Sequence, residues 1–186
     1  MSRASGCVAL PDVSNVKTVE LTDKAAGAYA TRGRIFAAFG QEEKALADLK
    51  TAYDRIPKNI ESDGVVLTHT WHQLRGLCAE LAHREEAHQC LAGLIDRATK
   101  AAGEYPGEPQ YRNALAELFA TLARMQKLRG RFAETLDTIQ KGLDTCPDNA
   151  LLLNGMAWML ANTANVGLRD PHKAVVLAKK ACERLP

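Results

Sequence analysis

The sequence has little net charge, few aromatic residues and no long apolar run. Its 24 lysine and arginine residues are nearly balanced by 22 acidic residues, which leaves a net charge of +2 over 186 residues. A protein that binds nucleic acid or a membrane surface through its charge needs a marked basic excess, so neither partner is expected. No apolar stretch approaches the roughly 20 residues that cross a bilayer, and the first residues lack the apolar region of a signal peptide. These absences predict a cytoplasmic protein.

Cysteine motifs and catalytic motifs are also missing. The five cysteines are widely spaced and contain no CxxC pair, which argues against a disulfide framework or zinc ribbon and favours a reducing cytosol. Neither HExxH nor a Cys–His finger spacing occurs, so no metal site is expected. The sequence has no GxSxG, no phosphate-binding loop and no dinucleotide-binding glycine set. We therefore predict that the protein is not an enzyme and uses no cofactor.

The composition favours helices, because alanine and leucine are abundant while aromatic residues make up only 5% of the chain. The first part of the chain contains Gly6 and Pro11 without a helical period, and we expect a loose arm or irregular cap over residues 1–22. From residue 23 onward apolar residues recur at helical spacing, so residues 23–186 are expected to form one helical domain.

A pattern of large, small and helix-breaking residues recurs along this domain. The first copy has Tyr29, Gly33, Phe36, Gly40, Ala45, Leu49, Ala52 and Pro57. The third copy has Phe119, Ala123, Gln126, Gly130, Thr135, Ile139, Gly142 and Pro147. Each copy predicts two antiparallel helices, with the glycine ending the first helix and the proline following the second.

The second copy is less regular than the first and third. Trp71 stands where the first copy has Tyr29, which sets the register of the other positions. In this register Arg75 takes the small position, Ala82 takes the position of the glycine stop, and Ala87, Leu91 and Leu94 match the second helix of the first copy. A register shifted by one residue, with Gly76 at the small position, is the alternative. No proline follows its second helix directly, so we expect that helix to continue further than in the first copy.

The fourth copy matches the third in both helices but is longer in the turn between them. Leu153 corresponds to Phe119 in the first helix, and Ala174 corresponds to Thr135 in the second. We expect the extra residues in the turn, followed by an N-cap at Asp170 and by Pro171 in the first turn of the last helix. The four copies are predicted at about residues 26–59, 68–101, 116–149 and 150–186.

These residues resemble the tetratricopeptide repeat family, in which helical pairs stack into a right-handed superhelix. The resemblance covers about residues 23–186, and residues 151–186 are similar to the closing repeat of many bacterial multi-repeat proteins. It implies an all-α solenoid of about four helix pairs, and a scaffold that binds a segment of a partner protein in a concave groove. The basic and asparagine set that clamps a partner's terminal carboxylate in part of this family is absent, since Ala30 and Ala120 occupy corresponding positions.

The resemblance also places particular side chains in the groove. These candidate partner-binding residues are Arg34, His69, His72, Arg124, Lys127, Asn154, Trp158 and Asn162. A mildly basic lining predicts an acidic or phosphorylated partner segment, whereas the alternative is a solvated face without charge recognition. Trp158 is a candidate contact because an exposed tryptophan supplies a large contact area, unless it packs under the next turn. Trp71 belongs to the repeat pattern and is expected in the core.

Two other functions remain open from the sequence. Helical-pair repeats that read single-stranded RNA have a similar period, but they need a basic groove and a recurring base-reading pair. A structural role in homo-oligomerisation is the other alternative. The last helix leaves Val175, Val176 and Leu177 with little cover, which predicts a homodimer through this helix or a partner that covers it.

Overall fold

The computed structural model describes residues 13–56 and 64–184 of the chain. This part contains eight α-helices and one short 3₁₀-helix, and no strand. The first four are α1 (Val13–Ala38), α2 (Glu42–Arg55), α3 (Gly64–Glu80) and α4 (Glu85–Glu104). The others are α5 (Pro109–Leu128), α6 (Phe132–Thr145), α7 (Ala150–Asn162), η1 (Val166–Leu168) and α8 (Pro171–Glu183). The predicted all-α class is confirmed.

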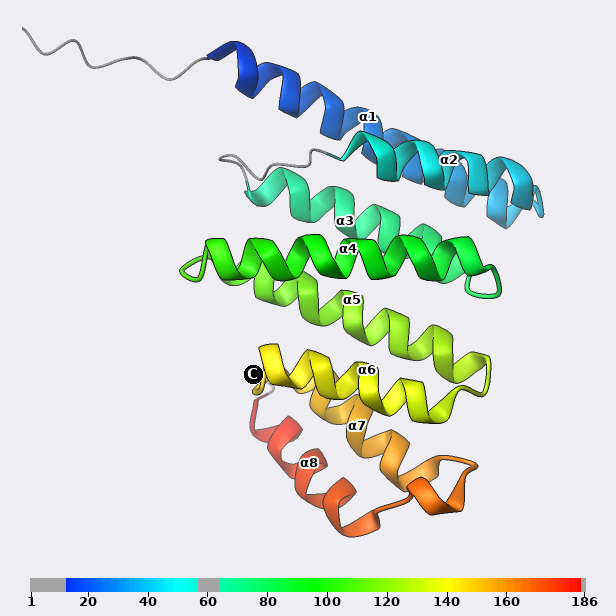
Figure 1. Ribbon diagram of the computed structural model, residues 1–186, viewed down its shortest axis with the longest axis vertical. Coiled ribbons are helices and arrows are strands. Elements are labelled where there is room, and N and C mark those ends of the chain that lie inside the picture. The colour runs from blue at the N-terminus through cyan, green and yellow to red at the C-terminus, as the bar shows by residue number, and fades with distance from the viewer. Residues whose placement is uncertain (1–12, 57–63, 185–186) are drawn as a thin grey trace, which may run out of the picture.

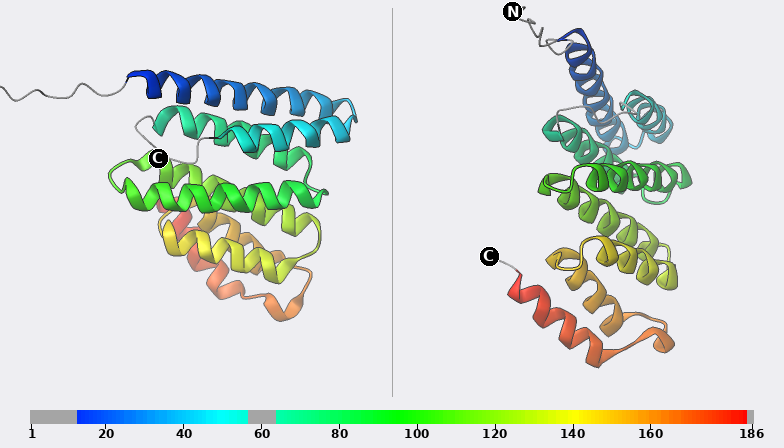
Figure 2. Two further views of the ribbon diagram at one scale, coloured as in Figure 1. Left: turned by 45° about the horizontal axis from the view of Figure 1, so that its top comes forward. Right: turned by 60° about the vertical axis from the view of Figure 1, so that its left-hand side comes forward.

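The helices form antiparallel pairs that stack in chain order. Consecutive helices pair as α1 with α2, α3 with α4, α5 with α6 and α7 with α8 (Figure 1). The odd-numbered helices also pack against one another from pair to pair, and they form one row of the two-layered stack (Figure 2). The α1–α2 pair lies at one end and the α7–α8 pair at the other, so the core is one elongated seam between the rows.

Glycine ends the first helix of two pairs, as predicted. Gly40 and Gly130 have φ angles of 70° and 72°, a left-handed conformation that favours glycine. At both turns the residue after the glycine donates its backbone N–H back to the helix: Gln41 to the Phe36 carbonyl at 2.8 Å and Arg131 to the Gln126 carbonyl at 3.0 Å. These bonds satisfy carbonyls that a helix terminus otherwise leaves unpaired. The sequence repeat therefore reproduces the same turn in two places.

The second pair ends its first helix without glycine. Here a buried histidine side chain helps to satisfy a carbonyl group in the turn after the helix. Nε2 of His88 lies 2.9 Å from the Ala82 carbonyl oxygen, and it donates a hydrogen bond there when the proton is on Nε2. The predicted register of the second copy places Ala87, Leu91 and Leu94 in the core, and all three are fully buried. Sequence reasoning found the apolar register of this pair but not the role of His88.

The last pair begins its second helix as expected. The Asp170 side chain accepts a hydrogen bond from the Lys173 backbone N–H at 2.9 Å, and Pro171 occupies the first helical turn. The additional residues of this repeat contain η1, whose start is capped by Asn165.

The predicted boundaries of the N-terminal arm and of the second and third copies differ from the structure. Residues 13–22 were expected in a loose arm, but they belong to α1, which begins at Val13. Both breakers that suggested the arm, Gly6 and Pro11, precede this helix, and no glycine or proline interrupts the segment that follows. Residues 1–12 of the predicted arm lie outside the described residues. The helices of the second and third pairs also extend beyond the predicted copies, since α4 ends at Glu104 and α5 begins at Pro109.

Small residues let successive helices approach closely, as the pattern predicts. A Cβ atom on Gly142 of α6 would lie 2.9 Å from Cδ1 of Leu152 and 3.1 Å from Cβ of Phe119. A Cβ on Gly33 of α1 would lie 2.6 Å from Cδ2 of Leu77 in α3. Such distances are shorter than van der Waals contact, so leucines of one pair occupy the space that these glycines leave on the pair before it.

We predict that Gly142→Val destabilises the protein, because the added atoms collide with Leu152 and Phe119. Overpacking of this kind costs about 1–3 kcal/mol. Gly103→Val is the matched control, since Gly103 also lies in a helix but no atom lies within 4 Å of its added Cβ. Urea unfolding of both variants measures the difference, and equal midpoints for the two would contradict the close packing at Gly142.

Candidate functional site

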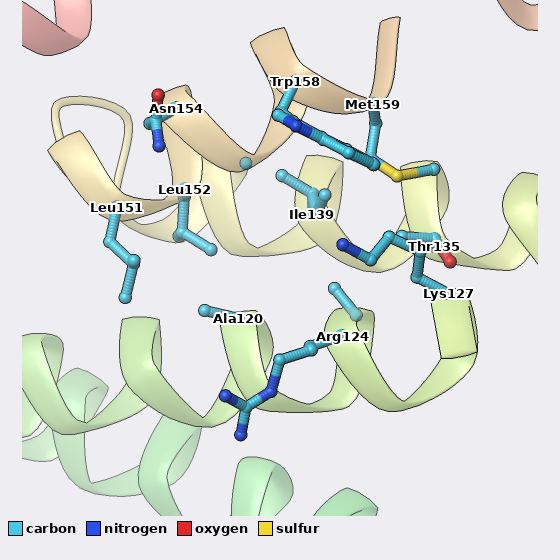
Figure 3. A pocket seen from close by; sticks show the side chains of 12 residues that line it. Ala120, Arg124, Lys127, Thr135, Ile139, Leu151, Leu152, Asn154, Trp158 and Met159 are labelled. Carbon is cyan, nitrogen blue, oxygen red and sulfur yellow. The ribbon is translucent and has the colours of Figure 1, made fainter. Parts of the chain in front are cut away.

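A hollow of about 360 Å³ opens between α5, α6 and α7. Four of the eight predicted groove residues line it: Arg124 and Lys127 from α5, and Asn154 and Trp158 from α7. Figure 3 shows these side chains around the space, together with apolar residues from all three helices. The structure thus assembles half of the predicted set at one place.

Helix geometry explains why these residues share a face. Arg124 and Lys127 are three residues apart, and Asn154 and Trp158 are four apart, which are the spacings of neighbours on a helix surface. The opposite faces of the same helices are buried, with Met125 in α5 fully covered. Burial of the apolar faces therefore fixes the direction in which the polar residues and Trp158 point.

The two cationic groups of the hollow differ in their surroundings. The Lys127 Nζ atom lies over the Trp158 ring, 4.1 Å from its centroid, in a cation–π arrangement. Arg124 is exposed and forms neither a hydrogen bond nor an ion pair with any residue that the structure describes, and its guanidinium lies apart from the other labelled side chains (Figure 3). The hollow therefore presents one guanidinium that is available to a carboxylate or phosphate.

The apolar part of the hollow was not predicted as part of the site. Its lining includes Ala120, Ile139, Leu151 and Met159. Leu151 is 51% exposed and Trp158 is 48% exposed, so the open side of the hollow carries two large apolar side chains. The signal in the sequence was weak, because Leu151 stands in a run of three leucines in which the next two are core residues.

The remaining predicted residues lie elsewhere or are engaged. Arg34 Nε donates to Glu80 at 2.8 Å, across the junction of α1 and α3. Asn162 uses its side-chain N–H to bond the Trp158 carbonyl at 3.1 Å, within its own helix.

His72 and His69 lie on α3, away from the hollow. His72 lies 3.0 Å from an Arg75 nitrogen and 3.5 Å from a Glu117 oxygen, and it borders a separate hollow between α3 and α5. His69 is exposed. The mildly basic lining expected along the first three pairs is thus offset by Glu80 and Glu117. Among the predicted groove residues, the lysine and arginine side chains without a described ion-pair partner are those of α5.

Thiol chemistry has little support in the described residues. A hydrogen bond to Cys90 and burial hold the pKa of the Cys78 thiol well above its usual range, so this thiol stays protonated at neutral pH. Burial also raises the pKa of Cys146. In residues 13–56 and 64–184, no three His, Cys, Asp or Glu side chains come together in a way that would hold a metal ion. No described helix is both long and apolar enough to span a bilayer.

Comparison with known proteins gives no further identification. No protein-family model matches the chain, and no curated protein matches its sequence.

The two tryptophans should respond differently to a soluble quencher. Trp71 is 1% exposed and Trp158 is 48% exposed. We expect Trp71→Phe, which leaves Trp158, to show red-shifted emission and strong acrylamide quenching. Trp158→Phe, which leaves Trp71, should show blue-shifted emission and weak quenching. Strong protection of Trp158 in the isolated protein would remove it from the exposed lining of the hollow.

Proposed function

We propose that this protein is a tetratricopeptide-type scaffold that binds a segment of a partner protein in the groove of a right-handed superhelix. The stack of antiparallel helix pairs in chain order supports this proposal, as do the matching glycine turns at Gly40 and Gly130. The close approach of helices at Gly33 and Gly142 agrees with the small positions of that repeat. Cytoplasmic residence is part of the proposal and rests on the unpaired spacing of the cysteines.

The observation that carries the proposal is the mixed chemistry of the hollow between α5 and α7. Its floor is apolar, a half-exposed tryptophan forms one wall, and Arg124 has no partner among the described residues. Aromatic and arginine side chains are the residue types that contribute most to protein–protein binding. A partner segment that carries a carboxylate beside an aliphatic or aromatic side chain fits both parts of this surface. The carboxylate would bind Arg124, and the apolar side chain would contact Trp158 and the apolar lining.

Lys127 supplies a second, weaker attraction for the same carboxylate. Its ammonium group already contacts the Trp158 ring, and it can turn toward an incoming anion because the lysine side chain is a flexible four-carbon stem. The guanidinium of Arg124 gives up no described bond on binding, so we expect it to contribute more than Lys127. The preferred ligand is therefore an acidic peptide with an apolar anchor.

Selection of short random peptides displayed on phage tests this function. We expect the selected peptides to combine an acidic residue with a large apolar one, and to bind Arg124→Glu at least about tenfold more weakly, as the loss of a charge-assisted hydrogen bond implies. Trp158→Ala should weaken binding comparably. Lys173→Glu is the control, because it makes the same charge change on the exposed start of α8.

Two results would contradict the proposal. Selected peptides that bind Arg124→Glu and Trp158→Ala as tightly as the unaltered protein would place binding elsewhere. Salt-sensitive binding of single-stranded RNA that Arg124→Glu abolishes, without any selected peptide, would favour the nucleic-acid alternative instead.

A further inference from the structure

A second, smaller hollow lies between α5 and α3. Its volume is about 210 Å³, and most of the residues that line it are polar, among them His72 and Arg75 from α3 and Glu117 from α5. We call it the α3–α5 hollow, and we call the hollow that holds Arg124 and Trp158 the α5–α7 hollow. Helix α5 is a wall of both, so a partner segment that lies along α5 contacts the two hollows in turn.

The charges of the α3–α5 hollow balance within the protein. Arg75 and Glu117 are the basic and the acidic residue among its described lining, and Nη2 of Arg75 lies 3.3 Å from Oε2 of Glu117. A cation attracted by Glu117 would therefore be repelled by Arg75, and an anion attracted by Arg75 would be repelled by Glu117. The α5–α7 hollow differs, because Arg124 and Lys127 line it without an acidic residue. The α3–α5 hollow thus favours an uncharged polar group.

Arg75 determines which nitrogen of the His72 ring carries the proton. Nη2 of Arg75 lies 3.0 Å from Nδ1 of His72. A guanidinium group can only donate, so Nδ1 accepts this hydrogen bond and the proton of the neutral ring is on Nε2. Nε2 forms no hydrogen bond with the residues that the structure describes, and the His72 side chain is 59% exposed. The Nε2–H group is therefore a donor that a ligand can reach.

Glu117 supplies an acceptor beside this donor. Its Oε2 atom lies 3.5 Å from Nδ1 of His72 and contacts Arg75, whereas Oε1 has no hydrogen bond to any described residue. The Glu117 side chain is 46% exposed. The hollow therefore presents one N–H donor and one carboxylate acceptor side by side. A carboxamide matches both, because its oxygen accepts, its NH₂ group donates and it carries no charge.

The geometry of α5 sets the spacing that a partner needs. Glu117 and Arg124 are seven residues apart, or about two turns, so they share one face of α5 at a separation of about 10.5 Å along its axis. An extended chain in the polyproline II conformation has three residues per turn and advances about 3.1 Å per residue. Side chains three residues apart then point the same way and lie about 9 Å from each other, which is close to the spacing on α5.

We infer that the partner segment carries a glutamine or asparagine three residues from its carboxylate, and that this carboxamide binds between His72 and Glu117. The carboxamide oxygen accepts a hydrogen bond from Nε2–H of His72, and its NH₂ group donates one to Oε1 of Glu117. The carboxylate binds Arg124 in the α5–α7 hollow. This inference rests on the proposed groove function and adds the residue type and the spacing by which the groove selects its partner.

A fixed set of synthetic peptides tests this inference. Each peptide has an aspartate next to a leucine and a variable residue that is Gln, Ala, Glu or Lys. The variable residue stands three positions before the aspartate in one series and three positions after it in the other. Fluorescence anisotropy of labelled peptides measures their Kd for the full chain. In one series we expect the Gln peptide to bind about tenfold more tightly than the Ala peptide, the effect of one hydrogen bond to a charged group, and more tightly than the Glu and Lys peptides.

Two variants separate the donor from the acceptor. His72→Phe removes the donor, so the Gln and Ala peptides should bind it with nearly equal affinity. Glu117→Ala removes the acceptor and leaves Arg75 without its carboxylate partner, so the Glu peptide should then bind more tightly than the Gln peptide. His172→Phe is the matched control, because His172 is exposed on α8 and lines neither hollow, and it should keep the preference for Gln. Circular dichroism checks that each variant keeps its helices.

The results distinguish this inference from the groove function. If binding depends on Arg124 and Trp158 but Gln and Ala peptides bind equally in both series, the inference is wrong and the groove function stands. A preference for Lys over Gln would also overturn it, because the α3–α5 hollow would then select a cation. So would a preference for Gln that persists in both His72→Phe and Glu117→Ala. Failure of every peptide to bind would contradict the inference and the groove function together.

Discussion

The structure depends on the insertion of large side chains from one helix pair against small residues of the pair before it. Leu77 packs at Gly33, and Leu152 packs at Gly142 beside Phe119, at distances that leave no room for a Cβ atom on either glycine. A hairpin of two short helices cannot bury its apolar face alone, so each pair is stabilised by its neighbours. The stacking of pairs in chain order depends on this contact.

Ion pairs decide which cationic side chains remain available to an anion at the hollow between α5, α6 and α7. Glu80 pairs with Arg34, and Glu117 lies beside Arg75 and His72, so the positive groups on α1 and α3 are largely offset. At the turns, Arg129 pairs with Glu85 at 2.8 Å and lowers the pKa of that carboxyl group, while Arg84 bridges Glu42 and Glu43. Exposed pairs of this kind contribute little stability, but they leave Arg124 as the guanidinium of the hollow without a described partner.

Much of the architecture could be predicted because it depends on local patterns. Glycine was expected to end two helices, and Gly40 and Gly130 do so in the left-handed conformation. Asp170 was expected as the N-cap of α8 and Pro171 in its first turn, and both occupy these positions. The role of His88 could not be predicted, because its partner is a carbonyl six residues away across an irregular turn. The start of α1 was misplaced because a missing apolar period does not prevent a helix when no breaker is present.

By itself, the sequence determined the helical class, the pairing of helices and the small positions where pairs approach, because spacing along a chain fixes which residues share a helix face. Tertiary structure decided which polar residues of those faces remain free. Arg34 and Arg124 stand at equivalent positions of the repeat, yet Glu80 pairs with one and no described group pairs with the other. The partner of a side chain depends on which residue of a neighbouring helix lies opposite it. The spacing of residues along one helix does not determine which residue of another helix that is.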